Sequence, residues 1–200
     1  MSRTGGPERR RQLIGEAIRA FGERGYEGTT LEAVAEAAGV RKQTLLYYFS
    51  SKEELFDACV NEIISGLRRS LERVVEGPPD GWARVEGVIR SIFALAKRWP
   101  EFPFFVREAA RRSPAVVQRI AGAVEPLRKQ ALVFLERGME VGEFRRQDPG
   151  LLLFTLYTAV VGSLTEAEAL RAVAGGASGR IALHKREGEL IEFVKRALEP

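Results

Sequence analysis

The 200-residue sequence contains a single cysteine, Cys59, and a single histidine, His184. One cysteine excludes an internal disulfide framework, and together with one histidine it is too little for a zinc site. The same scarcity leaves no Ser-His-Asp or Cys-His set, and no P-loop motif is present. We therefore expect no enzymatic activity, no catalytic residue, no metal and no cofactor.

Long apolar runs and strand patterns are also missing. No uninterrupted apolar run approaches the roughly 20 residues that a membrane-spanning helix needs. The N-terminal segment MSRTGGPERRRQ is followed by an amphipathic stretch and not by the apolar core of a signal peptide. We expect a cytoplasmic protein that does not associate with a membrane. No long alternation of apolar and polar residues occurs, and no Asn-Gly or Asp-Gly turn separates two such runs.

The charge is a weak clue to the partner. The net charge is +4 and the isoelectric point is near 9.4, which suggests an anionic partner. Residues 1–59, however, carry nine basic and nine acidic residues, so the excess lies in residues 60–200. Nucleic-acid binding by the N-terminal segment would therefore depend on where its charges are placed and not on their sum.

Helical spacing of apolar residues runs through the chain and predicts an all-α fold of about nine helices. We expect capping boxes at Thr29 with Glu32 and at Ser51 with Glu54, a cap at Asp148 before a proline, and a kink or break at Pro126. A GGASG segment separates the last two helices. The predicted helices are 7–24, 31–38, 43–49, 51–76, 82–99, 104–112, 114 to 138 or 142, 151–174 and 181–198.

Residues 31–49 fit a helix-turn-helix. Gly39 supplies the positive φ at which the first helix ends, and Leu45 would pack the second helix against it. The leading residues of the second helix would then project outward, where they can enter a major groove. These residues are Arg41, Lys42, Gln43 and Thr44.

The side chains of this stretch suit duplex DNA. Arg and Lys can donate to guanine, Gln can pair with adenine, and the Thr methyl group can meet that of thymine. Hydroxyl and ammonium groups next to them can donate to phosphate oxygens, which fixes the register. We assign this role to Thr29, Thr30, Tyr47, Tyr48 and Lys52. The competing interpretation is that both tyrosines are core aromatics and that Arg41 and Lys42 form a solvated turn.

The segment GYEGTTLEAVAEAAGVRKQTLLYYFSSKEELF, residues 25–56, resembles the N-terminal signature of the TetR family of transcriptional regulators. The matching features are the glycine-aromatic pair, the paired threonines, AAGV, the Thr-Leu pair and the aromatics ending in Phe49. Two residues depart from the pattern. Arg41 replaces a common serine, which removes a good N-cap but adds a donor, and Leu46 replaces a common tyrosine, which limits that position to apolar contact such as a thymine methyl group.

The resemblance implies a helix-turn-helix DNA-binding domain at residues 1–50 and a ligand-binding and dimerisation domain at residues 51–200. It further implies a homodimeric repressor on a palindromic double-stranded operator, released when an effector swings the helix that starts near Ser51. Two DNA-binding domains of a dimer, here called heads, that are spaced by one helical turn of DNA, about 34 Å, also bind DNA far more tightly than a single head does. Two stripes are candidates for the interface or simply for the core: Leu152, Thr155, Leu156, Ala159, Val160 and Ser163, and Ile191, Val194 and Leu198.

The effector site is harder to locate. Aromatic bulk in the central helices suggests an apolar cavity, and arginines beside it could meet a carboxylate or phosphate. We assign the site to Phe102, Phe105, Arg107, Arg111, Phe134, Phe154 and Tyr157. Core packing and a solvated basic face are the plainer interpretations. The hypothesis is a lipophilic acidic effector, of the fatty acid or acyl-CoA type that some members of this family sense. A cationic drug is the rival and would need inward-facing acids such as Glu108 or Glu136.

The sequence is also compatible with a different class of function. A helical scaffold that binds protein partners would share the composition and the helices, but it would have no affinity for DNA. The two classes differ in one inexpensive measurement, because only a DNA-binding regulator has a salt-dependent affinity for duplex fragments.

Overall fold

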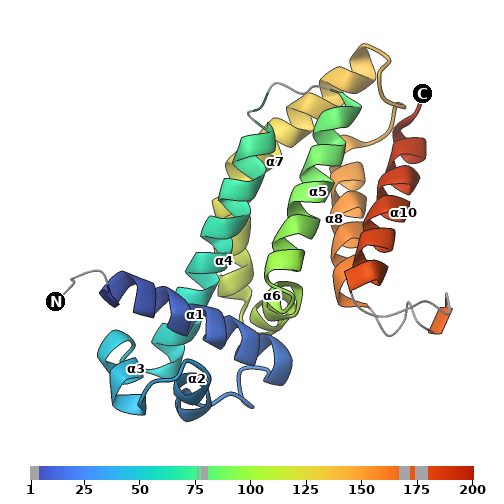
Figure 1. Ribbon diagram of the computed structural model, residues 1–200. Coiled ribbons are helices and arrows are strands. Elements are labelled where there is room, and N and C mark those ends of the chain that lie inside the picture. Colours follow the sequence, from blue (N-terminus) through green and yellow to red (C-terminus); the bar gives the residue numbers. More distant parts are fainter. Residues whose placement is uncertain (1–4, 76, 78–80, 167–171, 174–179) are drawn as a thin grey trace. The chain divides into compact units, whose positions relative to one another are not determined.

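The computed structural model describes residues 5–75, 77, 81–166, 172–173 and 180–200. These residues form nine helices and no strand, which confirms the all-α prediction (Figure 1). The GGASG segment lies outside them. No helix of the described ranges combines the length and the apolarity needed to cross a membrane. The helices are α1 (Gly5–Arg24), α2 (Leu31–Ala37), α3 (Lys42–Tyr48), α4 (Lys52–Val75), α5 (Trp82–Arg98), α6 (Phe102–Arg112), α7 (Pro114–Glu140), α8 (Pro149–Thr165) and α10 (Arg180–Leu198).

Contacts divide the chain into two compact units. Unit 1 comprises Met1–Gly66 and Trp99–Ile120, and unit 2 comprises Leu67–Arg98 and Ala121–Pro200. Unit 1 therefore holds α6 in addition to α1, α2 and α3, while α4 and α7 contribute residues to both units. The functional division at residues 50 and 51 stays a prediction, because the units record only which residues contact one another.

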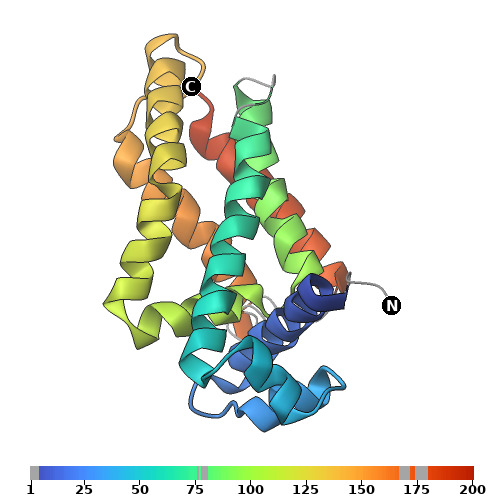
Figure 2. The ribbon, with the colours of Figure 1, turned by 90° about the vertical axis from the view of Figure 1, so that its left-hand side faces the viewer.

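The core of unit 1 follows from the spacing of apolar residues on α1. Leu13, Ala17 and Phe21 repeat every four residues, lie on one face and are fully buried. This unit places α1 against α2 and α6, and α2 against α3 (Figure 2). Phe21 also belongs to an aromatic cluster with Tyr26, Phe56 and Phe105, whose contacting rings are 5.2 to 6.3 Å apart. The cluster ties α1, α4 and α6 into one packed body.

The cap of α2 differs from the sequence prediction by one residue. Thr30, not Thr29, is the N-cap, and its hydroxyl oxygen accepts a hydrogen bond from the Ala33 backbone N–H at 3.1 Å. The expected box with Glu32 is therefore wrong, because the third helical position after Thr30 is an alanine that cannot reach back. Adjacent threonines have the same capping chemistry. Only the backbone conformation with which the chain enters the helix decides which of the two is the N-cap.

The other predicted helix ends fare better. Ser51 caps α4 through a 3.1 Å bond from the Glu54 N–H, although Glu54 accepts from the N–H of Ser50 and not from that of Ser51. Asp148 caps α8 by accepting from the Leu151 N–H at 2.8 Å, with a proline in the first turn. Pro126 does not break α7, which continues through it to Glu140.

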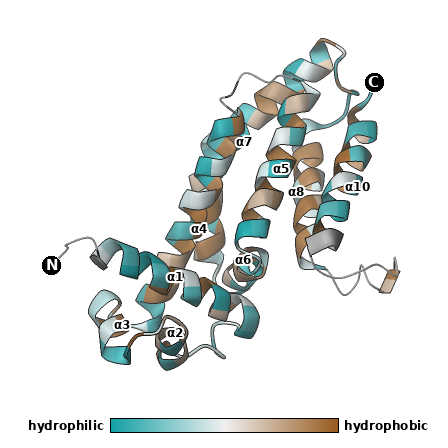
Figure 3. Cartoon of the chain, viewed as in Figure 1, coloured by the Kyte–Doolittle hydropathy of each residue, from teal (hydrophilic) through white to brown (hydrophobic). Residues whose placement is uncertain are grey.

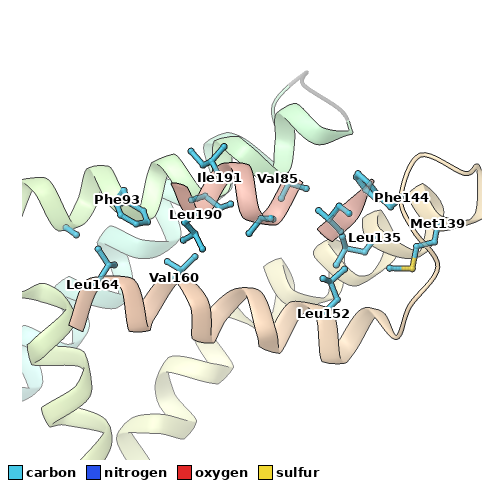
Figure 4. Packing of buried hydrophobic residues seen from close by; sticks show 14 residues of the cluster. Val85, Phe93, Leu135, Met139, Phe144, Leu152, Val160, Leu164, Leu190 and Ile191 are labelled. Carbon is cyan, nitrogen blue, oxygen red and sulfur yellow. The ribbon is translucent and has the colours of Figure 1, made fainter. Parts of the chain in front are cut away.

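The core of unit 2 lies among α5, α8 and α10, which contact one another. Figure 4 shows Phe93 of α5, Val160 of α8 and Leu190 of α10 as part of one buried cluster. Ile191, Val194 and Leu198 belong to the same cluster. The apolar stripe on α10, which the sequence leaves open as interface or core, is therefore core. A second subunit would have to contact other faces of α8 and α10.

An ion cluster also joins α5 to α10. The Glu187 side chain is only 4% exposed and pairs with Lys97, while an Arg90 nitrogen lies 3.6 Å from its other oxygen. His184 lies 3.8 Å from Glu187, and its side chain is 80% exposed. Two cations beside a buried carboxylate offset the free energy lost when that charge leaves water.

Candidate nucleic-acid interface

The turn between α2 and α3 has the geometry that the sequence predicts. Gly39 has a φ of +65°, a conformation that disfavours residues with a Cβ atom. Its N–H donates to the Glu36 carbonyl oxygen at 2.9 Å, and the Val40 N–H donates to that of Ala35 at 2.9 Å. Gln12 of α1 donates to the Ala38 carbonyl oxygen at 3.2 Å. These bonds satisfy the end of α2 and fix the direction in which α3 begins.

Helix α3 buries one side and presents its first turn to solvent. Leu45 is fully buried, and Phe49 directly after the helix is 1% exposed with Arg10 of α1 over its ring, 5.0 Å from the centroid. Arg41, Lys42, Gln43 and Thr44 are all exposed. The four residues predicted to reach base edges are thus brought together on an accessible helix start.

The remaining predicted contacts on α3 continue this surface. Arg41 is the N-cap residue, and its side chain, which has donors but no acceptor, forms no capping hydrogen bond. The exposed guanidinium group can donate to an outside acceptor. Tyr47 is 83% exposed and Leu46 is 37% exposed. Tyr48 is half-buried, and its ring meets that of Tyr47 edge-on at 5.2 Å. Neither tyrosine is fully buried as a core aromatic would be.

Lys42 has a partner that the sequence reasoning missed. Its ammonium group forms an ion pair and hydrogen bond with the Glu32 carboxylate on the first turn of α2. The hydrogen bond from Lys42 is the main reason why the pKa of Glu32 is held below its ordinary value. No short-range pattern links residues ten positions apart on two helices, so this pair could be found only from the turn geometry.

The two threonines before α2 have different environments. Thr30 is exposed and caps the helix. Thr29 is only 1% exposed, and its hydroxyl oxygen lies 2.8 Å from the Gly25 carbonyl oxygen and 3.0 Å from that of Ala20. The Thr29 hydroxyl thus meets carbonyl oxygens of the protein. The sequence assignment of Thr29 to a phosphate is therefore wrong, because its hydroxyl is buried and already donates inside the protein, while that of Thr30 stays a prediction.

Lys52 lies beside the loop that follows α1. Its ammonium nitrogen is 4.3 Å from the centroid of the Tyr26 ring and donates to the Glu27 carbonyl oxygen at 3.5 Å. The Tyr26 hydroxyl donates to Glu53 at 2.8 Å. Burial first, and then this bond to a carboxylate, raises the pKa of Tyr26 to about 12. The loop therefore holds an uncharged phenol next to Lys52.

Helix α6 contacts the same loop within unit 1. Arg112 pairs with Glu53 at 2.7 Å. Glu108 accepts a hydrogen bond from the Tyr26 backbone N–H at 3.1 Å, which is the main cause of the lowered pKa of this carboxyl group. The sequence places α6 only near an effector, and no local pattern indicates these two connections to the DNA-binding side of the unit.

The seven residues assigned to an effector do not lie in one unit. Four belong to unit 1: Phe102 and Phe105, which are buried, and Arg107 and Arg111, which are exposed. The other three belong to unit 2. Phe134 is half-buried against Phe144, whereas Phe154 and Tyr157 of α8 are 61% and 58% exposed. Their common role in effector binding stays a prediction.

Comparison with known proteins agrees with this geometry. Residues 13–59 match the family described as bacterial regulatory proteins, tetR family. The chain is 26% identical to the HTH-type transcriptional regulator RutR of Escherichia coli (strain K12) over 168 residues, which cover 84% of this chain and 79% of that protein. It is 28% identical to the HTH-type transcriptional repressor KstR2 of Mycobacterium tuberculosis over 139 residues, covering 68% and 70%.

Solved structures show the same fold over nearly the whole chain. The ketosteroid transcriptional regulator KstR2 superposes with a TM-score of 0.80 at 22% identity, covering 96% of this chain and 95% of that one. AibR, solved in complex with isovaleryl coenzyme A and operator DNA, gives a TM-score of 0.74 at 19% identity, with 93% and 97% covered.

The exposed start of α3, the α2–α3 turn and the family match together define a helix-turn-helix DNA-binding protein. Residues 13–59 carry the DNA-binding domain of the tetR family, and the chain is a DNA-binding transcriptional regulator, not an enzyme.

Proposed function

We propose that the protein is a homodimeric repressor that binds a palindromic operator with two copies of α3, one from each subunit. The observation that carries the proposal is the exposure of Lys42, Gln43 and Thr44 while Leu45 is fully buried. Arg41, Lys42, Gln43 and Thr44 read base edges, and Leu46 contacts a thymine methyl group. Thr30, Tyr47, Tyr48 and Lys52 fix the register through phosphates, whereas Thr29 is buried and has no part in this contact.

The dimer is supported by an apolar surface on unit 2. Helix α8 has no charged residue from Pro149 to Thr165, and Figure 3 shows it mostly in the hydrophobic colour. Leu151, Phe154 and Tyr157 of this helix and Phe193 of α10 are 58 to 67% exposed. Monomeric proteins seldom leave large apolar side chains gathered in this way. A dimer with two-fold symmetry about this face would place two identical DNA-binding domains on the two half-sites of a palindromic operator.

The effector is a lipophilic acid, of the fatty acid or acyl-CoA class. Two similar structures are described with such ligands or roles: AibR with isovaleryl coenzyme A, and the fatty acid degradation regulator FadR of Bacillus halodurans, which has a TM-score of 0.70 at 17% identity. Arg107 and Arg111 are exposed cations that could meet the acidic group. A cationic effector has less support, because the Glu108 carboxylate already accepts a hydrogen bond from the Tyr26 N–H.

Binding of the effector favours a state in which α4 has swung and the two heads no longer fit both half-sites. The ligand can shift this balance only by its difference in affinity for the two states, typically about 1 to 3 kcal/mol of coupling. The helix that starts at Lys52 contributes residues to both units, which supports its role in this coupling.

The proposal is tested by selecting bound fragments from a random duplex pool and measuring their affinity by fluorescence anisotropy. The double variant Tyr47→Phe, Lys52→Ala should bind every duplex more weakly, and Lys52→Ala should flatten the salt slope by up to about one unit. Gln43→Ala should relax the preference at one base pair. Parental affinity in the double variant would refute the phosphate assignments, and absence of duplex binding by the parent would refute the function.

The effector is tested on the selected duplex. Long-chain fatty acids and their acyl-CoA thioesters are titrated into the complex, with cationic amphiphiles as the matched comparison. Release by the acids alone supports the proposed class. Release by the cations alone would show that the site is built for the opposite charge.

A further inference from the structure

We propose that Glu32 is a specificity-determining residue, which restrains Lys42 and thereby lowers the affinity of the protein for duplexes that lack the operator sequence. This inference depends on the proposed function, because it assumes that Lys42 faces DNA. Glu32 is a negatively charged residue on a recognition surface that otherwise offers cations to DNA. Its role is to help the protein discriminate between the operator and other duplexes.

The pair is built into the helix-turn-helix. Glu32 lies on the first turn of α2, whose start is fixed by the Thr30 cap, and Lys42 is the first residue of α3, whose start is fixed by the Gly39 turn. Both backbone positions are therefore held by hydrogen bonds of their own. The side chains remain accessible, with 60% of Glu32 and 44% of Lys42 exposed. DNA that approaches α3 meets the carboxylate together with the ammonium group.

An ammonium group has three N–H donors, and this number separates two kinds of complex. At the right base, Lys42 can keep its bond to Glu32 and direct the remaining donors at guanine O6 and N7. On an arbitrary sequence the only attraction is phosphate, which carries the same charge as Glu32. Lys42 must then leave the carboxylate, or bring it close to the phosphate against their repulsion. Glu32 therefore weakens phosphate-only binding more than base-directed binding.

Glu36 offers a matched control. It lies one helical turn after Glu32 on the same short helix and is exposed. In the described part of the chain its side chain forms no ion pair or hydrogen bond, in contrast to that of Glu32. Replacing either glutamate by glutamine changes the net charge equally, so a difference between the two variants reports the contact with Lys42.

The experiment compares the parent, E32Q and E36Q on the selected operator and on a scrambled duplex of equal length, across a salt series. For E32Q we expect the affinity for the scrambled duplex to rise about two- to five-fold, with a steeper salt slope and a smaller ratio of specific to non-specific affinity. E36Q should stay closer to the parent. The same E32Q substitution in a K42Q background should have a smaller effect, because the group that it releases is gone.

Each result decides between the alternatives. An unchanged ratio in E32Q, an equal change in E36Q, or an equal effect of E32Q in the K42Q background would overturn the role of Glu32. Thermal unfolding of each variant checks that all are folded at the assay temperature. If the parent binds no duplex, the proposed function fails and this inference with it, whereas parental binding with no effect of E32Q refutes this inference alone.

Discussion

Arg112 lies over the ring of Tyr26, with its guanidinium carbon 3.5 Å from the ring centroid. The same side chain pairs with Glu53, which also accepts a hydrogen bond from the Tyr26 hydroxyl group. One arginine at the end of α6 thus holds the loop after α1 and the first turn of α4. Everything that this arginine joins lies in unit 1, so we expect it to stabilise the DNA-binding side of the molecule.

Replacing Arg112 by alanine should lower the free energy of unfolding by about 1 to 2 kcal/mol, since it removes a cation–π contact and an ion pair of a side chain that is 28% exposed. Urea unfolding measures the change. Arg111→Ala is the control: this side chain is 80% exposed and should cost no more than about 0.5 kcal/mol. Equal losses in the two variants would show that the contact with Tyr26 contributes nothing.

Two glycines of unit 1 should respond to alanine with opposite sign. Gly39 has a φ of +65°, and no atom lies within 4 Å of the position that a Cβ atom would take, so Gly39→Ala should destabilise through backbone strain alone, by about 1 kcal/mol. Gly15 lies inside α1, also with open space around it, so Gly15→Ala should stabilise by about 0.5 to 1 kcal/mol. Urea midpoints at constant m-value check both, and a stabilising Gly39→Ala would contradict the turn.

Glu108 should make stability depend on pH in the acid range. Its pKa is lowered in the folded protein, chiefly by the Tyr26 N–H, so its charged form stabilises the fold above the pKa of the unfolded chain. That contribution is lost as the pH falls through the folded pKa. Glu108→Gln should therefore unfold at a lower temperature than the parent at neutral pH, and the gap should close on acidification. Glu136→Gln, at an exposed position of α7, should parallel the parent, and a constant gap for Glu108→Gln would be incompatible with this explanation.

The proposed dimer depends on the apolar face of α8 and α10. Phe154→Lys or Phe193→Lys should weaken dimerisation about ten-fold or more, because a buried aromatic contact is replaced by an unpaired charge. Sedimentation at graded concentrations measures the constant. Val133→Lys is the control, since Val133 is a 64% exposed apolar residue on α7. An unchanged constant for both phenylalanine variants would move the interface elsewhere.

Much of the fold was predictable because helices are local. The order and approximate ends of the helices follow from apolar spacing, glycines and caps, and Ser51, Asp148 and Gly39 act as the sequence indicates. The N-cap of α2 was misassigned because two neighbouring threonines carry the same chemistry. Core and interface stripes could not be told apart either, since both consist of apolar residues at helical spacing, and only burial in unit 2 assigned Ile191 to the core.

The sequence by itself determined the all-α class, the helix-turn-helix and the identity of the side chains at the start of α3, because these depend on residues within one or two helical turns. The tertiary structure alone decided which charges are already partnered. Glu32 with Lys42, and Arg112 with Glu53, are pairs whose members lie 10 and 59 positions apart. Contacts of this kind arise from how helices are packed, and helix packing is fixed by the sum of many buried contacts that no local pattern records.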